Sequence, residues 1–499
     1  MSQATTPQST AGSNTPGSNT PDAKTAGPST ASPAAMAPSP RAGKPLIVAV
    51  VGSGPSGFYA ASSLLEQTAV PVRVDMFERL ATPWGLVRSG VAPDHPKIKT
   101  VSGVYEQIAA HANFRFFGNV HIGRDVTREE LTARYDAVLY AVGTQTDRRL
   151  GIPGEDLPGS VSAVDFVGWY NGHPEYADFS FDLSGERAVV IGAGNVALDV
   201  ARLLCSPAQR LGRTDIADHA LTALRDSSIT EVMVVGRRGA AQAAFTTPEL
   251  RELPEFTESG VDVDPAEVGP QPGEEALSRA AKRNLAVLRG YADTPAAPGR
   301  RRVALRFQRT PLEIRGDGRV EEVVFARNAL TVGEDGWVGA VDTGERETVP
   351  ANLVLRAVGY RGVAFGGLPF DERRGVIANE RGRVTGAERE YVAGWIKRGP
   401  TGIIGTNRKC AAETVARLFA DLAEGSLRRH DRGVAFDHDV EIVSWLLERQ
   451  PHLVTEEGWQ LIDAAERAAG AASGRPRVKL VLTDELLDIA LERQSVTPR

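Results

Sequence analysis

Two stretches of the chain repeat one hydrophobic pattern. Residues 46–51 form a continuous apolar run of the kind that a parallel strand buried on both faces needs. A glycine-rich turn at residues 52–57 follows, then a helical pattern at 58–65 and an apolar strand at 72–77. The order recurs as a strand at 188–191, a turn at 192–197, a helix to residue 204 and a strand at 231–235. Each stretch predicts the first half of a doubly wound sheet.

The first glycine turn predicts a dinucleotide site. A pyrophosphate group needs backbone N–H donors at a helix N-terminus, and a side chain there would obstruct its approach. Gly52 and Gly54 meet that need, and Gly57 lets the helix pack closely on the strand. Glu78 ends the next strand, where a carboxylate would hold ribose hydroxyls. We expect FAD at this turn; a surface glutamate that merely follows a strand is the alternative.

The second glycine turn contains Gly192 and Gly194 and ends in Ala197, a common variant. Where the counterpart of Glu78 would stand, the chain has Arg237 and Arg238. An acid there would repel a 2′-phosphate, whereas two guanidinium groups can pair with it. The pair therefore predicts NADP(H) rather than NAD; two solvated arginines at a strand end are the alternative.

The predicted fold class is α/β, with two Rossmann-like dinucleotide-binding domains and the NADP domain inserted into the FAD domain. Apolar strands at 137–143 and 353–359 both end in glycine, and we expect them to carry the chain from one nucleotide fold to the other and back. The FAD-binding domain would comprise residues 44–146 and 360–499, and the NADP-binding domain residues 147–359. Residues 206–229 lengthen the second crossover, and residues 260–300, rich in Pro, Gly and Ala, are expected to be irregular in part.

The first 43 residues are mostly Ser, Thr, Pro, Ala and Gly, and residues 1–21 carry no charged side chain. Such a segment has too little apolar area to offset its ordering entropy, so we expect a disordered tail. It has neither the pattern of a secretory signal nor that of a mitochondrial presequence. No apolar run reaches the roughly 18–20 residues of a membrane span. These features predict a cytoplasmic protein without membrane insertion.

Charge and cysteine content narrow the chemistry. The 57 Lys and Arg residues against 63 Asp and Glu give a net charge of −6, which offers no argument for nucleic acid. The two cysteines, Cys205 and Cys410, are far apart, which excludes a disulfide framework, a CxxC redox pair and a cysteine-ligated iron–sulfur cluster within the chain. We expect the chemistry to come from bound FAD and NADP, without a metal.

The chain resembles adrenodoxin reductase and its bacterial ferredoxin–NADP reductase relatives. The resemblance covers residues 45–425 and is suggested again in the tail at 475–489. One departure is Pro248, where the family pattern leads us to expect an aliphatic residue. The matching blocks are residues 52–59, 84–96, 168–172, 192–202, 235–238, 245–253 and 394–404.

The resemblance implies the cofactor contacts. Trp395, beside a glycine-rich turn, suits a surface against the isoalloxazine ring, although ordinary core filling is the alternative. The positions that match FAD contacts are Ser56, Glu78, Leu86, Ile122, Trp395, Gly402, Ile403 and Ile404. The positions that match NADP contacts are Ala193, Gly194, Asn195, Val196, Arg237, Arg238, Glu249 and again Gly402.

The resemblance also implies two catalytic candidates, His95 and Glu252, which match a polar, water-linked network near the nicotinamide and flavin. His95 lies in a rigid loop between two prolines, and an imidazole titrates near neutral pH. A purely structural histidine is the alternative. Glu249 and Glu252 share one helix face if Pro248 starts a helix, and a solvated acidic face is the alternative there.

The predicted activity is that of a flavoprotein oxidoreductase, which takes hydride from NADPH to FAD and passes single electrons to a ferredoxin-type iron–sulfur protein. Because the chain carries no cluster, that partner must dock, and ferredoxins are generally acidic. The family implies a monomer. Two alternatives stay open, an NADPH-dependent flavoprotein monooxygenase and a non-catalytic NADP(H)-sensing flavoprotein, whereas the cysteine content excludes a disulfide reductase. The candidates for a basic docking patch are Arg251, Arg279, Lys282, Arg283 and Arg289.

Overall fold

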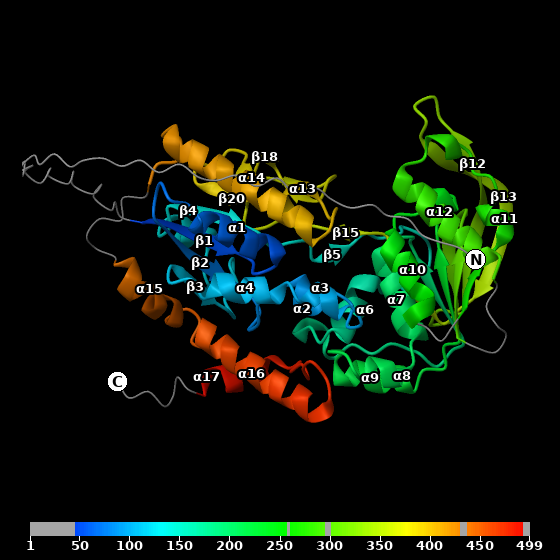
Figure 1. Ribbon diagram of the computed structural model, residues 1–499, viewed down its shortest axis with the longest axis horizontal. Helices are drawn as coiled ribbons and strands as arrows, with labels where there is room; N and C mark the ends of the chain where they lie inside the picture. Colours follow the sequence, from blue (N-terminus) through cyan, green and yellow to red (C-terminus); the bar gives the residue numbers. More distant parts are fainter. Residues whose placement is uncertain (1–44, 257–259, 295–300, 430–436, 493–499) are drawn as a thin grey trace, which may run out of the picture. The chain divides into compact units, whose positions relative to one another are not determined.

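Two parallel-stranded sheets organise the chain, as the hydrophobic pattern predicts (Figure 1). The computed structural model describes residues 45–256, 260–294, 301–429 and 437–492, so the tail predicted at residues 1–43 lies outside the described residues. The predicted fold class, α/β with two Rossmann-like folds, one inserted into the other, is confirmed.

The first sheet has seven strands in the order β18-β19-β20-β4-β1-β2-β3. The five strands from β20 to β3 run parallel, and β18 and β19 extend the sheet antiparallel. The sheet therefore draws on residues before 141 and again on residues after 378. Its strands are β1 (Leu46–Val51), β2 (Val72–Phe77), β3 (Phe114–Phe117), β4 (Ala137–Tyr140), β18 (Asn379–Glu380), β19 (Arg383–Val384) and β20 (Glu390–Val392).

Both faces of this sheet are buried, which explains the uninterrupted apolar run in β1. Alternate residues beginning at Leu46 face a core shared with α1, α4, α14, α16 and α17, and those beginning at Ile47 face a core shared with α5 and α15. These helices are α1 (Pro55–Leu65), α4 (Ser102–Ala109), α5 (Arg128–Thr132), α14 (Ile404–Ala423), α15 (His438–Leu447), α16 (Glu456–Ser473) and α17 (Thr483–Leu491).

The second sheet has six parallel strands in the order β6-β14-β7-β8-β10-β9. Its strands are β6 (Ser160–Ser162), β7 (Arg187–Ile191), β8 (Glu231–Val235), β9 (Gly260–Val263), β10 (Arg302–Arg306) and β14 (Leu353–Arg356). One face packs on helices α6 (Ala163–Tyr170), α7 (Asn195–Cys205), α9 (Asp218–Arg225), α10 (Thr247–Phe256) and α12 (Arg279–Ala292).

A three-stranded antiparallel sheet covers the other face of the second sheet. Its strands are β11 (Arg309–Arg315), β12 (Glu322–Val332) and β13 (Val338–Pro350). Ile314, Val323 and Phe325 from this sheet share a core with Val189 and Ile191 of β7. The hydrophobic pattern did not predict this layer, in which β12 and β13 form a long hairpin (Figure 1).

The chain crosses between the two parallel sheets twice, close to the strands that predicted the crossings. The outgoing segment β5 (Thr146–Asp147) follows β4, and the returning segment β15 (Tyr360–Arg361) follows β14. The two segments pair antiparallel, Tyr360 with Asp147 and Arg361 with Thr146. The insertion therefore begins and ends at one two-stranded ribbon.

Shorter elements complete the fold. Part of the segment expected to be irregular is the 14-residue helix α12, capped by Ser278 and held by buried Leu285 and Leu288, while residues 295–300 lie outside the described residues. The shorter elements are α2 (Leu86–Ser89), α3 (Pro96–Lys99), α8 (Ala208–Leu211), α11 (Pro265–Val268), α13 (Trp395–Arg398), β16 (Phe370–Asp371), β17 (Val376–Ile377) and single 3₁₀ turns at Pro174–Tyr176, Ala240–Gln242 and Glu274–Ala276.

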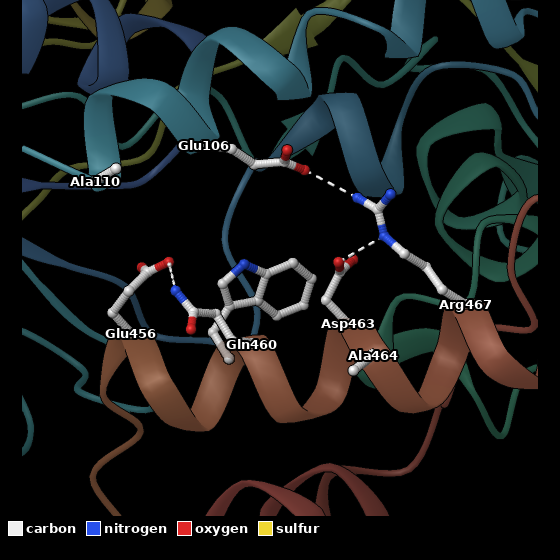
Figure 2. A pocket seen from close by; sticks show the side chains of 8 residues that line it. Glu106, Ala110, Glu456, Gln460, Asp463, Ala464 and Arg467 are labelled. Atoms are coloured by element: carbon white, nitrogen blue, oxygen red, sulfur yellow. Dashed lines mark hydrogen bonds and ion pairs between the residues drawn. The ribbon is translucent and has the colours of Figure 1, made fainter.

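An acidic cavity of about 460 Å³ lies between α4 and α16 (Figure 2). Arg467 crosses it and donates hydrogen bonds to Glu106 and Asp463, at 2.9 and 2.6 Å. Burial raises the pKa of Glu456, on its wall, to about 7. None of the predicted site residues lines this cavity.

Candidate functional site

The first glycine turn presents an open helix start at the end of β1. Gly52 has φ +102°, and a Cβ there would lie 2.6 Å from the Ala141 carbonyl oxygen. A Cβ on Gly57 would lie 2.0 Å from the Gly52 oxygen, so both positions require glycine for packing. Gly54 differs, because a Cβ there meets nothing within 4 Å, and no side chain caps α1. The space beside Gly54 and the uncapped amides form a cradle for a diphosphate.

The second turn repeats this geometry at the end of β7. Gly192 has φ +136°, and a Cβ there would lie 2.2 Å from the Ala357 oxygen. A Cβ on Gly194 again meets nothing within 4 Å, and no side chain caps α7. The Asn195 side chain accepts a hydrogen bond from the Thr246 amide at 2.8 Å, which ties the start of α7 to the loop before α10.

The residues that follow β2 in the first fold and β8 in the second fold carry opposite charges, as the sequence indicated. Glu78 follows β2 and folds back to the first turn, where its carboxylate accepts hydrogen bonds from the Ser53 amide and hydroxyl at 3.1 and 2.6 Å. Arg237 and Arg238 follow β8, with Arg237 exposed and Arg238 half-buried. The first fold thus offers an acid beside its glycine turn, and the second offers two cations.

Several predicted FAD positions gather around the first turn. Trp84 and Gly85 have φ +82° and +51°, and a Cβ on Gly85 would lie 2.9 Å from the Gly54 Cα, so this bend passes directly over the turn and delivers Leu86. On another side, a Cβ on Gly394 would overlap the Ser56 hydroxyl, which brings Trp395 close to α1.

The surroundings of the Trp395 side chain are a separate indication of a binding site. Its ring centroid lies 5.4 Å from that of Tyr360, and its indole Nε1 is buried without a hydrogen-bond partner among the described residues. Buried donors are normally paired, so this N–H is available to donate to a bound group.

The remaining predicted FAD positions are less informative. Ile122 is buried beyond β3, in the core on the other face of the sheet. Gly402 has φ +82°, and Ile403, 69% exposed, precedes α14. An apolar side chain this exposed beside a glycine turn is consistent with a cofactor surface. The assignment of Gly402 to both cofactors stays a prediction.

The structure brings the two catalytic candidates together in a buried charge cluster. His95 Nε2 lies 3.2 Å from Glu249 and 3.4 Å from Asp199, and His95 Nδ1 lies 3.6 Å from Glu252. The helix that carries both glutamates begins at Thr247, one residue before Pro248, so the two side chains share the face that meets His95. Sequence reasoning missed Asp199, which lies one turn into α7.

Arg202 completes the cluster and was also missed. It is fully buried on α7 and donates to Asp94 at 2.6 and 3.0 Å and to Asp199 at 2.8 Å. Its Nη2 lies 2.5 Å from His95 Nε2, a contact that opposes a charged imidazole. The nearby carboxylates of Asp199 and Glu249 outweigh burial and that contact, and they raise the pKa of His95 to about 10.

This cluster joins the two folds. Residues 84–96 run from the bend over the first glycine turn to Asp94 and His95, which contact α7 of the second fold. His95, Glu249 and Glu252 lie close enough to share a cation. The Arg202 guanidinium already supplies positive charge at the same histidine nitrogen, so the arrangement favours an ion-pair network over a metal site.

The raised pKa predicts how His95 contributes to stability. Folding raises the pKa of His95 from 6.5 to about 10, so the protonated imidazole stabilises the folded protein. This contribution is present in full below pH 6.5 and is lost as the pH rises from 6.5 through 10. The stability difference between the wild type and His95→Asn, measured by urea unfolding, should therefore shrink over that range by on the order of 2–4 kcal/mol. His452→Asn, at an exposed histidine, should show no such trend. A difference for His95→Asn that stays constant from pH 6.5 to 10 would contradict the prediction.

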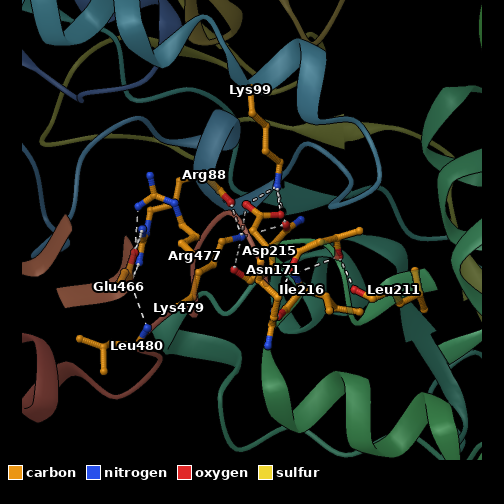
Figure 3. A network of polar contacts seen from close by, with 12 residues as sticks. Arg88, Lys99, Asn171, Leu211, Asp215, Ile216, Glu466, Arg477, Lys479 and Leu480 are labelled. Carbon is orange, nitrogen blue, oxygen red and sulfur yellow. Dashed lines mark hydrogen bonds and ion pairs between the residues drawn. The ribbon is translucent and has the colours of Figure 1, made fainter. Parts of the chain in front are cut away.

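The C-terminal segment forms a second tie between the folds (Figure 3). Lys479 is buried and donates to the carbonyl oxygens of Arg88 and Asn171, both at 3.0 Å. Asp215 accepts from Lys99 at 2.7 Å and lies 3.3 Å from Lys479. Arg88, on α2, pairs with buried Glu466 at 2.8 and 2.5 Å. This network fixes the segment after Leu86 against the second fold. In the sequence, only the resemblance to the family at residues 475–489 indicated a role for this part of the chain.

The predicted basic patch is only partly available. Arg251, Arg279, Lys282 and Arg283 are exposed on α10 and α12. Arg289 instead pairs with Glu274 through two hydrogen bonds of 2.8 and 2.9 Å and donates to two backbone carbonyls. Its charge is already neutralised locally, so it is the weakest member of the patch.

Known proteins that bind pyridine nucleotides are similar to this chain in sequence. The family described as pyridine nucleotide-disulphide oxidoreductases matches residues 47–268. NADPH-ferredoxin reductase FprA of Mycobacterium tuberculosis is 56% identical over 454 residues, which cover 90% of this chain and all of FprA. The mitochondrial NADPH:adrenodoxin oxidoreductase of Arabidopsis thaliana is 41% identical, with 90% of this chain and 96% of the relative covered.

Solved structures agree with the sequence comparison. The structure of Mycobacterium tuberculosis FprA in complex with NADPH matches with a TM-score of 0.86 and 56% identity, over 90% of this chain and all of that one. Within the described residues, no helix has the length and apolar character that crossing a bilayer requires. With identity this high over almost the full length of these relatives, the chain belongs to the family of NADPH–ferredoxin reductases, which resemble adrenodoxin reductase.

Proposed function

We propose that this chain is an NADPH–ferredoxin reductase that binds FAD at the first glycine turn and NADPH at the second. The observation that carries the proposal is the pair of uncapped helix starts, at Gly54 and Gly194, each beside open space. Glu78 beside one turn and two arginines beyond the other suit a ribose and a 2′-phosphate respectively. The family relationship supports the same assignment.

The residues around the first turn fit FAD. The cradle beside Gly54 would take the pyrophosphate, and the unpartnered Nε1 of Trp395 and the exposed Ile403 lie on segments near α1. When bound there, FAD supplies the conversion between a two-electron hydride donor and a one-electron acceptor. We propose residues 44–146 and 360–499 as its domain and residues 147–359 as the NADP domain, which agrees with the residues that each parallel sheet draws on.

The protein's own residues act by holding the two folds in register. Arg202 and Asp94 fix the loop that carries His95 against α7, and Lys479 fixes Arg88 against the second fold. A pKa near 10 keeps His95 protonated at neutral pH, which makes it a poor proton acceptor. We propose that His95 orients Glu249 and Glu252 at the junction of the two folds, and that these acids hold the water-linked network there.

The experiment that tests the function is anaerobic stopped-flow mixing of the FAD-loaded protein with NADPH, followed by mixing with a panel of ferredoxins. Rapid bleaching of the flavin by NADPH and fast reoxidation by at least one ferredoxin are expected. A protein that binds NADPH without reducing its flavin would instead be a sensor. Oxygen consumption matched to a small organic substrate, with no ferredoxin reduction, would favour the monooxygenase alternative.

The docking surface can be tested by charge reversal. Replacing Arg279, Lys282 and Arg283 with glutamate should raise the KM for ferredoxin about tenfold, with flavin reduction by NADPH unchanged, because rim charges mainly steer association. Arg225→Glu, at an exposed arginine on α9, is the matched control and should leave that KM unchanged. Unaltered ferredoxin kinetics in the triple variant would remove this patch from consideration.

Three further properties belong to the same proposal. The enzyme would act as a monomer, in the cytoplasm and without a nucleic-acid partner. The net charge of −6 supports the last of these. Size-exclusion chromatography with light scattering would test the monomer directly.

A further inference from the structure

The β12–β13 hairpin holds the turn that carries Arg237 and Arg238. Asn328 of β12, 6% exposed, donates its side-chain amide to the Arg237 carbonyl oxygen at 2.8 Å. The Gln308 amide, just before β11, donates to the Arg238 carbonyl oxygen at 3.0 Å. A Cβ on Gly239 would lie 2.6 Å from the Leu330 side chain, so the turn also packs directly on the hairpin. The antiparallel layer therefore fixes the backbone of both arginines.

A tryptophan on the same hairpin reaches the Arg238 side chain. Trp337 stands where β12 turns into β13 and is 56% exposed, the largest aromatic surface that the described residues leave open. The Arg238 guanidinium carbon lies 5.7 Å from the centroid of its ring. A Cβ on Gly339 would lie 2.8 Å from Trp337 Cζ3, so the ring rests against bare backbone and its position depends on that glycine.

We propose that Trp337 is a positioning residue for recognition of the NADPH 2′-phosphate, acting through Arg238. Arginine is a flexible side chain, and fixing it before the ligand arrives reduces the entropy lost on binding. A cation–π contact with an indole supplies that restraint and leaves the N–H groups of the guanidinium edge available to a phosphate. This inference rests on the proposed binding of NADPH at the second glycine turn.

The mechanism makes Trp337 selective for the 2′-phosphate. If Trp337 acts through Arg238, its loss weakens NADPH binding and leaves NADH binding unchanged, because NADH has no phosphate at that position. If the indole instead stacks directly on adenine, both nucleotides are affected alike. If the indole only stabilises the hairpin, a folded variant at position 337 binds NADPH and NADH with the same affinities as the wild type.

The test compares Trp337→Ala, Trp337→Phe, Arg238→Gln and the double variant Trp337→Ala/Arg238→Gln. Equilibrium titration calorimetry gives the Kd for NADP⁺ and NAD⁺, and steady-state reduction of ferricyanide gives kcat and KM for NADPH and NADH. Trp337→Ala should raise the Kd for NADP⁺ and the KM for NADPH about two- to fivefold, with kcat and both NADH parameters unchanged. Trp337→Phe should restore part of the loss.

The double variant separates this inference from the assignment of the site. Arg238→Gln alone should raise the Kd for NADP⁺ by about 10- to 100-fold, and Trp337→Ala should add nothing to it. An equal loss for both nucleotides in Trp337→Ala, or a further loss on top of Arg238→Gln, would overturn the role of Trp337 and leave the NADPH site standing. An unchanged Kd in Arg238→Gln would overturn the contact of Arg238 with the 2′-phosphate and the role of Trp337 with it, whereas a wild-type protein that binds no NADP⁺ would overturn the site itself.

Discussion

Replacing Gly54 with valine is expected to abolish FAD binding while the protein still folds, and the same change at Gly194 is expected to abolish NADPH binding alone. Both residues have backbone angles that any residue adopts, with φ −77° and −120°, and a Cβ at either meets nothing within 4 Å. The added Cβ therefore meets no atom of the free protein. It fills the space through which a diphosphate reaches the uncapped amides.

The expected effect is large because several hydrogen bonds to charged oxygens are lost together. Each contributes about 1.5–3 kcal/mol, so the Kd for the affected nucleotide should rise by about a thousandfold or more. FAD content follows from the absorbance of the purified protein, and NADP⁺ binding follows from calorimetry. Far-UV circular dichroism of both variants serves as the control for folding.

The two variants serve as controls for each other. The Gly54→Val protein should be colourless, whereas the Gly194→Val protein should retain FAD at full stoichiometry and fail to be reduced by NADPH. A Gly54→Val protein that keeps its FAD, or a Gly194→Val protein that loses FAD and binds NADP⁺ normally, would contradict the assignment of the two turns.

Replacing Arg202 with methionine is expected to destabilise the protein by about 3–5 kcal/mol, the usual cost of leaving buried charges unpaired. Methionine keeps much of the side-chain volume but removes the cation that faces Asp94, Asp199 and Glu249. The loss should appear in urea unfolding of the FAD-loaded protein. Because Arg202 and Asp94 lie on different folds, we also expect faster proteolysis of the loop around Asp94 in the variant.

Two comparisons decide whether the cause is the charge network. Arg202→Lys should recover only part of the loss, since one ammonium cannot span the two carboxylates that the guanidinium fork reaches. Arg213→Met removes an exposed arginine of the second fold and should change the free energy of unfolding by less than about 0.5 kcal/mol. Equal stabilities for Arg202→Met and the wild type would show that the network does not hold the folds together.

The sequence predicted the parts of the fold that depend on local pattern. The apolar runs at β1 and β7 indicated strands buried on both faces, and alternate residues of each do pack into separate cores. The glycine turns were readable because a positive φ at Gly52 and Gly192 and the close approach at Gly57 leave few other residues possible. The difference between Glu78 and the arginine pair could be predicted because each lies within a few residues of the end of its strand.

Other parts had no local signal. The antiparallel layer of β11, β12 and β13 was missed because its strands carry mixed polar and apolar residues, and much of β13 is exposed. From the sequence alone, Asp199 and Arg202 are indistinguishable from ordinary polar residues of an amphipathic helix, and Lys479 from a polar residue of the C-terminal segment. Each acquires its role only because Asp94, His95 or Asn171, distant in sequence, lies against it.

By itself, the sequence determined that the protein has two nucleotide folds and where each glycine turn lies, since these follow from the backbone geometry of a few neighbouring residues. It also predicted which cofactor each turn takes. Only the tertiary structure decided how the folds meet. The high pKa of His95, the buried Arg202 and the Trp337 contact with Arg238 all arise where segments separated in sequence come together. Burial and proximity set those interactions, and neither is encoded in any single stretch of chain.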